Sequence, residues 1–370
     1  MMQLLSLLVA VFALLGSGCT PPPEPIRIGF IGGLSGRVSD LGTGGLQGVR
    51  LAVEMRNRNG GIKGRQIALL EADDQQDPET AMKAFDKLIG NGVVTVIGPM
   101  TSEITKAILP RANARRLLLL SPTASTNDLS GLDDYFFRIF PSTRHFVQAV
   151  ADYYFKEKSL RRIRLVYDLD NRSYTESWVG DFRQAIEGNG GTLLKPISFT
   201  SGDGTNFLDL ARRALEGKPQ AIIAVSNSVD AAMLFQGIRK LDGTVHLGTS
   251  GWAGTERLAE LGGKWAEGAL VAHAFDRNSR QQGYLDFRAA YHKRFNREPG
   301  FAELFGFDAA NVVLEALERQ LPGQSLKETL QKQRTFQAAQ SVIAFDDFGD
   351  VQGSIMMLVI RDGRFIPLTN

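Results

Sequence analysis

Short apolar runs alternate with segments of helical periodicity through the first third of the chain. Strands are expected at 26–31, 66–71, 93–97 and 117–120, with helices between them at 42–58, 78–89 and 102–115. Pro78 suits the first turn of its helix, because the backbone hydrogen bond that proline cannot donate is not needed there. Apolar strands that alternate with amphipathic helices predict βαβ units, in which helices cover both faces of a mainly parallel sheet.

The same alternation begins again in the middle of the chain. After a strand-like segment at 135–139, strands are expected at 162–167, 193–199, 221–225 and 245–247, with helices at 144–155, 174–187, 206–215 and 229–241. Two long helices, 280–295 and 301–320, precede strand-like segments at 341–345 and 355–360. At about 100–200 residues per domain, 370 residues suit two domains. We therefore expect an α/β protein with two doubly wound, mainly parallel sheets.

The N-terminal residues do not follow this pattern. The segment 4–15 is apolar except for Ser6, which is short for a membrane span and typical of the core of a signal peptide. Small residues then precede Cys19, and this resembles the lipobox of bacterial lipoproteins. We predict a signal peptide over 1–18, followed over 19–25 by a lipidated Cys19 and a stiff proline-rich tether. A plain secretory signal with an incidental cysteine is the alternative.

The composition argues against nucleic-acid binding and against a cysteine-based metal site. The chain has 42 Lys and Arg against 40 Asp and Glu and no long run of like charge, so we expect no nucleic-acid-binding surface. Its four histidines are scattered and its single cysteine is Cys19, which leaves no disulfide framework and no cysteine-based zinc site. We expect neither a cofactor nor a metal.

The loops that follow the strands are the places to look for a site, since ligands of open parallel sheets bind beyond the carboxyl ends of the strands. Two consecutive strands end in hydroxyl-rich loops, 98–102 and 121–126. Ser102 also begins a helix, where free backbone N–H groups beside a hydroxyl favour a carboxylate or another anion. Ordinary helix capping is the competing interpretation of Ser102, but two neighbouring strands that end alike favour a shared site.

Motifs for catalysis are weak by comparison. The glycine-rich segment 42–48 only roughly imitates a dinucleotide-binding turn, because it does not directly follow a strand. The acidic residues between Glu71 and Asp77 end a strand and precede a helix, which favours a solvated turn over a metal site. The chain has no P-loop and no His-Glu-x-x-His motif, and no set of acid, base and nucleophile stands out. We therefore do not expect an enzyme.

Several motifs together resemble the type I periplasmic binding proteins of the leucine/isoleucine/valine-binding family. In chain order they are Ile28–Gly36, Gly60–Gly64, Asp73–Pro78, Val96–Pro99, Ser121-Pro122, Arg161–Asp168 with Tyr174, and Asp308–Ala310. This resemblance, which runs from about Ile26 to Arg364, implies two Rossmann-like lobes joined by three hinge segments, with a ligand captured between them. It places lobe 1 at 26–141 plus 275–345 and lobe 2 at 142–274 plus 346–370.

The resemblance also implies where the ligand binds. Ser102 and the loop Thr123-Ala124-Ser125 match the family elements that bind the carboxylate of the ligand. Tyr174 matches an aromatic residue of lobe 2 that covers the ligand.

The other half of the implied site departs from the family. Leu41, and either Asn227 or Ser228, stand where aromatic residues are common in the family. Ser250 stands where an acidic residue normally pairs with the ammonium group of the ligand. Trp252 is a further candidate through its aromatic face, and Glu303 or Asp170 through its charge. Because a buried ammonium without a countercharge is costly, the ligand is expected to be an amino acid or an acid without an ammonium group, such as an aromatic acid.

These expectations combine into one function. The resemblance implies the solute-binding component of an ABC importer, an exported and lipid-anchored monomer in the periplasm or at the cell surface, which delivers a small molecule to a membrane permease. A ligand sensor of the same fold that signals to a partner is the alternative.

Overall fold

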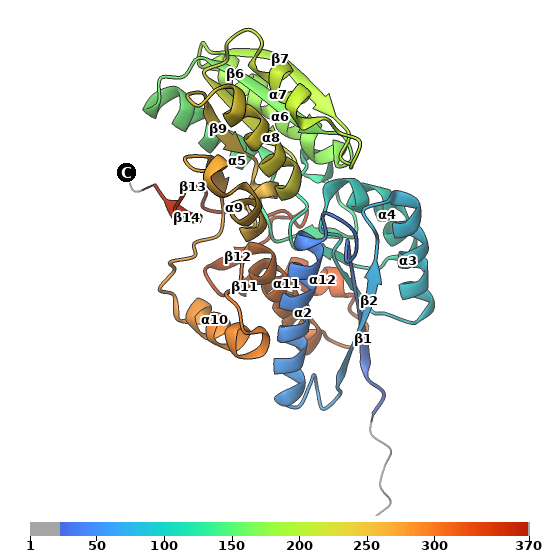
Figure 1. The fold of residues 1–370 in the computed structure, drawn as a ribbon. Coiled ribbons are helices and arrows are strands. Elements are labelled where there is room, and N and C mark those ends of the chain that lie inside the picture. Colours follow the sequence, from blue (N-terminus) through green and yellow to red (C-terminus); the bar gives the residue numbers. More distant parts are fainter. Residues whose placement is uncertain (1–22, 369–370) are drawn as a thin grey trace, which may run out of the picture.

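Two sheets organise the chain in the computed structural model, which describes residues 23–368 (Figure 1). The first sheet is parallel and has the strand order β2-β1-β3-β4-β5. Its strands are β1 (Ile26–Gly32), β2 (Ile67–Asp73), β3 (Val96–Ile97), β4 (Leu119–Ser121) and β5 (Phe136–Arg138). The helices between them are α2 (Asp40–Arg58), α3 (Pro78–Gly90), α4 (Ser102–Arg115) and η1 (Asn127–Leu129). We call the part built on this sheet the first lobe.

The second sheet has seven strands in the order β14-β13-β10-β9-β8-β6-β7. Five of them run parallel: β6 (Arg162–Asp168), β7 (Thr192–Phe199), β8 (Ala221–Val225), β9 (His246–Thr249) and β10 (Leu270–His273). The hairpin β13 (Met356–Arg361) and β14 (Arg364–Pro367) adds two antiparallel strands at the β10 edge. Its helices are α5 (Thr143–Asp152), η2 (Tyr153–Glu157), α6 (Arg172–Gly188), α7 (Phe207–Leu215), α8 (Ser228–Leu241), η3 (Gly251–Ala253), α9 (Glu256–Gly262) and η4 (Gly263–Trp265). This part is the second lobe.

After β10 the chain returns to the first lobe. It forms α10 (Gln282–Phe295), α11 (Phe301–Arg319), α12 (Leu326–Gln333) and a two-stranded sheet of β11 (Thr335–Gln337) and β12 (Val342–Ala344). Helix α11 lies along α2 (Figure 1). Glycines permit this close approach, since a Cβ on Gly48 would lie 2.0 Å from the carbonyl oxygen of Glu303 and one on Gly306 would lie 2.2 Å from that of Gly45.

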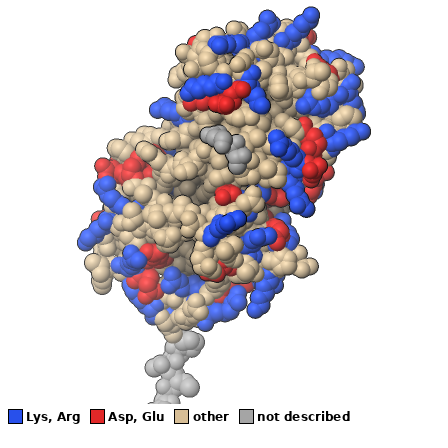
Figure 2. All heavy atoms as spheres, turned by 90° about the vertical axis from the view of Figure 1, so that its left-hand side faces the viewer, with Lys and Arg blue, Asp and Glu red and all other residues tan. Residues whose placement is uncertain are grey.

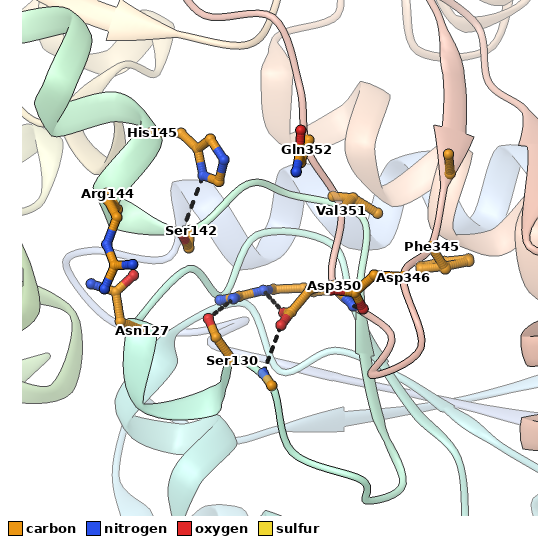
Figure 3. Close-up of a pocket in the computed structure, with 13 residues that line it drawn as sticks. Asn127, Ser130, Ser142, Arg144, His145, Phe345, Asp346, Asp350, Val351 and Gln352 are labelled. Atoms are coloured by element: carbon orange, nitrogen blue, oxygen red, sulfur yellow. Dashed lines mark hydrogen bonds and ion pairs between the residues drawn. The ribbon is translucent and has the colours of Figure 1, made fainter.

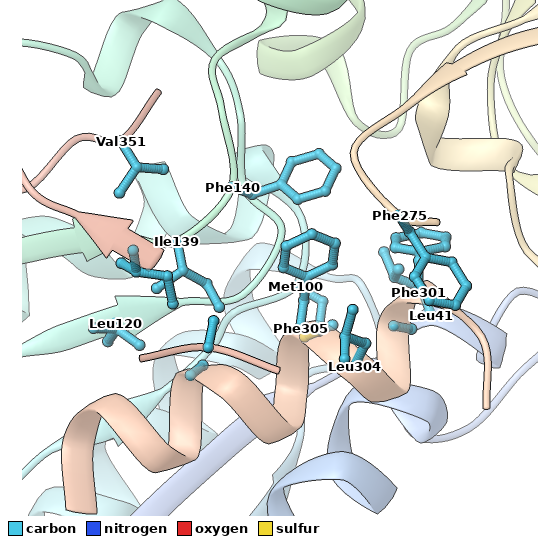
Figure 4. Packing of buried hydrophobic residues seen from close by; sticks show 14 of the residues in the cluster. Leu41, Met100, Leu120, Ile139, Phe140, Phe275, Phe301, Leu304, Phe305 and Val351 are labelled. Carbon is cyan, nitrogen blue, oxygen red and sulfur yellow. The ribbon is translucent and has the colours of Figure 1, made fainter. Parts of the chain in front are cut away.

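One apolar core connects the lobes where the chain passes between them. It passes between β5 and α5, between β10 and α10, and between β12 and β13. Phe140 lies on the first of these passages, and its ring centroid is 4.8 Å from that of Phe305 and 5.0 Å from that of Phe146. Figure 4 shows Phe140 above the α11 residues Phe301 and Phe305. The ligand cavity described below is bounded by this same aromatic group.

The sequence-based prediction of two mainly parallel α/β sheets is confirmed. Eight short elements were not predicted, because segments of three to eight residues carry too little periodicity; they are η1, η3, α9, η4, β10, α12, β11 and β14. The predicted signal peptide, Cys19 and the last two residues of the chain lie outside the described residues.

Candidate ligand site

A cavity lies where the two lobes meet. Its volume in this structure is about 20 Å³, roughly the room of one water molecule, so a ligand needs its walls to move apart. It is lined by Leu41, Met100, Thr101, Ser102, Thr123, Ser125, Phe140, Asn171, Tyr174, Gly251, Trp252 and Phe301. Beside the cavity, hydrogen bonds join the two lobes directly. The backbone N–H of Glu103 donates to Asn171 Oδ1 at 3.1 Å. The Glu103 carboxylate accepts from the N–H of Ser173 at 2.8 Å and from its hydroxyl at 2.5 Å. The lobes are therefore closed around the cavity.

The polar wall of the cavity comes from the first lobe. Strands β3 and β4 end side by side, so the loops that follow them, at Ser102 and at Ser125, meet beyond the sheet. The buried Ser102 Oγ accepts from the backbone N–H of Ser125 at 3.1 Å and of Thr126 at 3.2 Å. A hydroxyl has two lone pairs and one proton, so these bonds leave Ser102 free to act only as a donor. No acceptor for that proton exists among residues 23–368, which leaves it for a ligand.

The loop around Thr123 is held in place by hydrogen bonds of its own. The Thr123 hydroxyl donates to the carbonyl of Met100 at 2.5 Å, so it fixes the two loops against each other. Ser121 Oγ accepts from the N–H of Ala124 at 3.0 Å and donates to the carbonyl of Pro99 at 2.6 Å. Ser125 is buried in the lining and forms no side-chain hydrogen bond within the described part of the chain. Ser102 and Ser125 therefore supply hydroxyls on a rigid backbone.

The opposite wall comes mainly from the second lobe and is aromatic. The rings of Tyr174 and Trp252 pack edge to face with centroids 5.9 Å apart. Burial raises the pKa of Tyr174 to about 12, against smaller opposing effects of Ser250 and the Trp252 backbone, so its hydroxyl stays protonated at neutral pH. Phe140 and Phe301, with ring centroids 6.4 Å apart, bring aromatic surface from the inter-lobe passage and from α11. These rings suit the apolar part of a small ligand.

None of the twelve lining residues carries a charge. Next to Gly251 of the lining, the Ser250 hydroxyl is buried and makes no hydrogen bond of normal geometry within residues 23–368. Behind the aromatic wall, His273 is fully buried 4.4 Å from the Phe301 ring, and burial lowers its pKa to about 3. Neutral His273 and Ser250 do not replace a carboxylate, so the cavity offers no countercharge to an ammonium group.

Six of the ten sequence-predicted ligand residues meet at this cavity: Leu41, Ser102, Thr123, Ser125, Tyr174 and Trp252. Four are not in its lining. Ala124 and Ser250 are neighbours of lining residues and are buried. Asn227 caps α8 by accepting from the N–H of Asp230 at 2.9 Å. Glu303 accepts from the N–H of Gly300 at 3.0 Å and pairs with Arg297 at 2.6 Å.

The other six lining residues were not among the predicted ligand residues, although the first two lie in the loop 98–102 marked from the sequence: Met100, Thr101, Phe140, Asn171, Gly251 and Phe301. The rule that sites lie after the carboxyl ends of strands applies to Met100, Asn171 and Gly251, which follow β3, β6 and β9. Phe301 starts a helix far along the chain, and only the packing of α11 on α2 brings it here.

A larger pocket of about 740 Å³ lies beside the passages between the lobes (Figure 3). Its charged centre is already paired: Arg138, 1% exposed, donates to Asp350 at 2.7 Å and to the carbonyl of Thr126 at 2.8 Å, and Asp350 also accepts from the N–H of Gly131 at 2.9 Å. These paired groups hold the chain in place, and the exposed Arg144 also lines this pocket. The smaller cavity, with the free proton of Ser102, is the better candidate.

Over residues 23–368, no helix is both long and apolar enough to cross a membrane, and no group of side chains suits a metal ion. Basic and acidic side chains lie near one another over much of the face drawn in Figure 2.

Comparisons with known proteins agree with this architecture. A model of the family described as periplasmic binding protein matches residues 25–363. Leu/Ile/Val-binding protein homolog 3 of Brucella melitensis is 24% identical over 93% of both chains, and the leucine-, isoleucine-, valine-, threonine- and alanine-binding protein of Pseudomonas aeruginosa is 23% identical over 95% of this chain and 94% of its own.

Two solved structures show the same fold. A leucine-binding protein from Thermotoga maritima has a TM-score of 0.86 at 22% identity and covers 93% of this chain and 98% of its own. A solute-binding protein of an ABC transporter from R. palustris, in complex with benzoate, has a TM-score of 0.84 at 16% identity and covers 93% of this chain and 95% of its own. The family model spans nearly all of the described residues, so the chain belongs to the periplasmic binding protein family.

Proposed function

We propose that this protein is the solute-binding component of an ABC importer and captures a small carboxylate between its lobes. The observation that carries the proposal is the geometry of Ser102, whose oxygen is occupied by two backbone N–H groups and whose proton has no acceptor among the described residues. A carboxylate has only acceptors, so it complements this donor and the neighbouring Ser125 hydroxyl. The names of the relatives, which bind branched-chain amino acids or benzoate, support the same class of ligand.

The uncharged lining favours a particular kind of carboxylate. An amino acid would bring an ammonium group into a cavity whose lining has no acidic side chain, and desolvating that group without a partner is costly. An acid without an ammonium group needs only the hydroxyls at one end and the aromatic walls of Tyr174, Trp252 and Phe301 around the rest. Both classes fit the hydroxyl end, and the uncharged lining favours the second.

A thermal-shift screen of matched carboxylates and carboxamides tests the carboxylate. We expect 4-methylpentanoate or 3-phenylpropanoate to raise the melting temperature more than the corresponding amides do, because an amide keeps one acceptor oxygen for Ser102 and lacks the second. Stabilisation by neutral or cationic solutes alone would contradict the proposal. Recovery of the bound acid unchanged after incubation would separate capture from catalysis.

The arrangement of the whole chain is part of the proposal. Lobe 1 comprises 26–141 plus 275–345 and lobe 2 comprises 142–274 plus 346–370. Cys19 anchors an exported monomer to a membrane, next to the permease. Replacing Cys19 with alanine should move the protein from the membrane fraction to the soluble fraction. Deleting the gene for this protein should abolish uptake of the labelled ligand if the protein serves an importer. The deletion should leave uptake intact if the protein is a sensor.

A further inference from the structure

A second set of inter-lobe contacts lies beside the cavity, on the loop that joins β1 to α2. Arg37 on this loop reaches across to the second lobe, where its Nη2 pairs with Asp230 of α8 and lies 3.2 Å from Ser201 Oγ. The Asp230 side chain is fully buried, whereas that of Arg37 is 29% exposed. The first lobe therefore places a cation against a buried anion of the second lobe.

Asp40, the first residue of α2, makes the reciprocal contact. Its Oδ2 accepts from the hydroxyl of Ser228 at 2.8 Å and from that of Thr255 at 2.6 Å, and both donors belong to the second lobe. Neither Arg37 nor Asp40 lines the cavity, although the next residue, Leu41, does. The first turn of α2 and the loop before it thus contribute both a residue of the cavity lining, Leu41, and the inter-lobe contacts of Arg37 and Asp40.

The partner of Arg37 belongs to a crowded acidic group. Asp230 accepts from the Asn227 amide at 2.7 Å, and that amide also lies 3.4 Å from Asp168. Burial, and then the charges of Asp170 and Asp230, raise the pKa of Asp168 to about 7. Burial and Asp230 also raise the pKa of Asp170, and Arg37 opposes that shift. Among residues 23–368, Arg37 is the one Lys or Arg that pairs with Asp230.

We propose that Arg37 and Asp40 form an inter-lobe latch that sets how long a captured ligand stays, without touching the ligand. In the closed state Arg37 compensates the buried negative charge of α8, and opening the lobes gives up this pairing together with the two hydroxyl bonds of Asp40. Losing one partner of a buried charge pair acts mainly on the rate at which a complex comes apart. These are positioning residues, and their effect on ligand release rests on the proposed function.

The test is stopped-flow kinetics with 3-phenylpropanoate as the probe, on the wild type, Arg37→Gln and Asp230→Asn. We expect Arg37→Gln to speed release by about tenfold and to change the association rate by less than about threefold. The double variant should release the probe no faster than the faster single variant, since both substitutions remove one interaction. Arg50→Gln is the matched control, because Arg50 pairs with Glu71 inside the first lobe and should leave release unchanged.

A ligand-free measurement separates the latch from the proposed function. Small-angle scattering of the ligand-free protein should give a larger radius of gyration for Arg37→Gln than for the wild type and Arg50→Gln, because the closed state loses its pairing. Equal release rates in the wild type and Arg37→Gln would overturn the latch. If no acid binds, the carboxylate proposal fails. In that case a larger radius of gyration for Arg37→Gln than for the wild type still supports the latch, and equal radii overturn it.

Discussion

The two lobes line the same cavity with different kinds of side chain. The first lobe contributes the hydroxyls of Ser102 and Ser125, held by backbone hydrogen bonds at the ends of two parallel strands. The second lobe contributes Tyr174 and Trp252, whose rings shape the space, and its nearby Ser250 hydroxyl makes no hydrogen bond of normal geometry within residues 23–368. This difference underlies the proposed roles of the lobes: under our proposal the first lobe binds the carboxylate, and the second lobe determines which other groups the ligand can have.

The largest expected effect comes from breaking the anchor with Ser102→Ala. Removing this oxygen deletes the ligand donor and leaves the N–H groups of Ser125 and Thr126 buried without acceptors, so affinity for 3-phenylpropanoate should fall by about 30–100-fold. Calorimetric titration measures the loss. Ser121→Ala is the control, since Ser121 holds the same loop without lining the cavity and should cost stability more than affinity. Similar affinity losses in both variants would assign Ser102 a structural role only.

Removing part of the aromatic wall should lower the affinity for the acid less than removing the Ser102 hydroxyl does. Trp252→Ala removes half-buried aromatic surface, and we expect affinity for the same acid to fall by about tenfold. Because the anchor remains, the variant should still prefer the acid over its amide. Trp265→Ala, in η4 and outside the cavity lining, should bind as the wild type does. Loss of the acid-over-amide preference in Trp252→Ala would show that the lobes do not divide recognition in this way.

Adding a negative charge to the second lobe's side of the cavity should shift the preference between an acid and its amino acid toward the amino acid. Ser250→Asp places a carboxylate beside the uncharged lining, so phenylalanine should gain several-fold in affinity while 3-phenylpropanoate loses several-fold. Calorimetry of both ligands on both proteins measures the change in preference. Ser250→Asn, which is similar in size but neutral, is the control. An unchanged preference in Ser250→Asp would mean that position 250 does not face the ligand.

The smallest effect concerns pH and the acidic group of the second lobe. Burial raises the pKa of Asp168 to about 7, so the folded state holds its proton more tightly than the unfolded chain does. The stability due to this proton is fully present below about pH 4 and is lost as pH rises toward 7. Asp168→Asn should flatten this decline in urea titrations between pH 4 and 7. An unchanged slope would contradict the raised pKa.

The sequence predicted the hydroxyl wall of the candidate cavity better than the rest of its lining. Ser102 and Ser125 follow adjacent strands, and the rule for parallel sheets brings such residues together without knowledge of the packing. Asn227 was predicted from the resemblance and Glu303 from its charge, and local helix capping occupies both side chains. Phe140 and Phe301 escaped prediction because their place depends on the passages between the lobes and on the packing of α11, which no local pattern encodes.

Two pairs of ligands test most directly whether the cavity anchors an acid and offers nothing to an ammonium group. Calorimetric titration would compare 3-phenylpropanoate with phenylalanine and 4-methylpentanoate with leucine, since the members of each pair differ only in the ammonium group. With the uncharged lining, we predict that each acid binds at least about tenfold more tightly than its amino acid. Tighter binding of phenylalanine and leucine would contradict this and would place an unrecognised countercharge at the ligand.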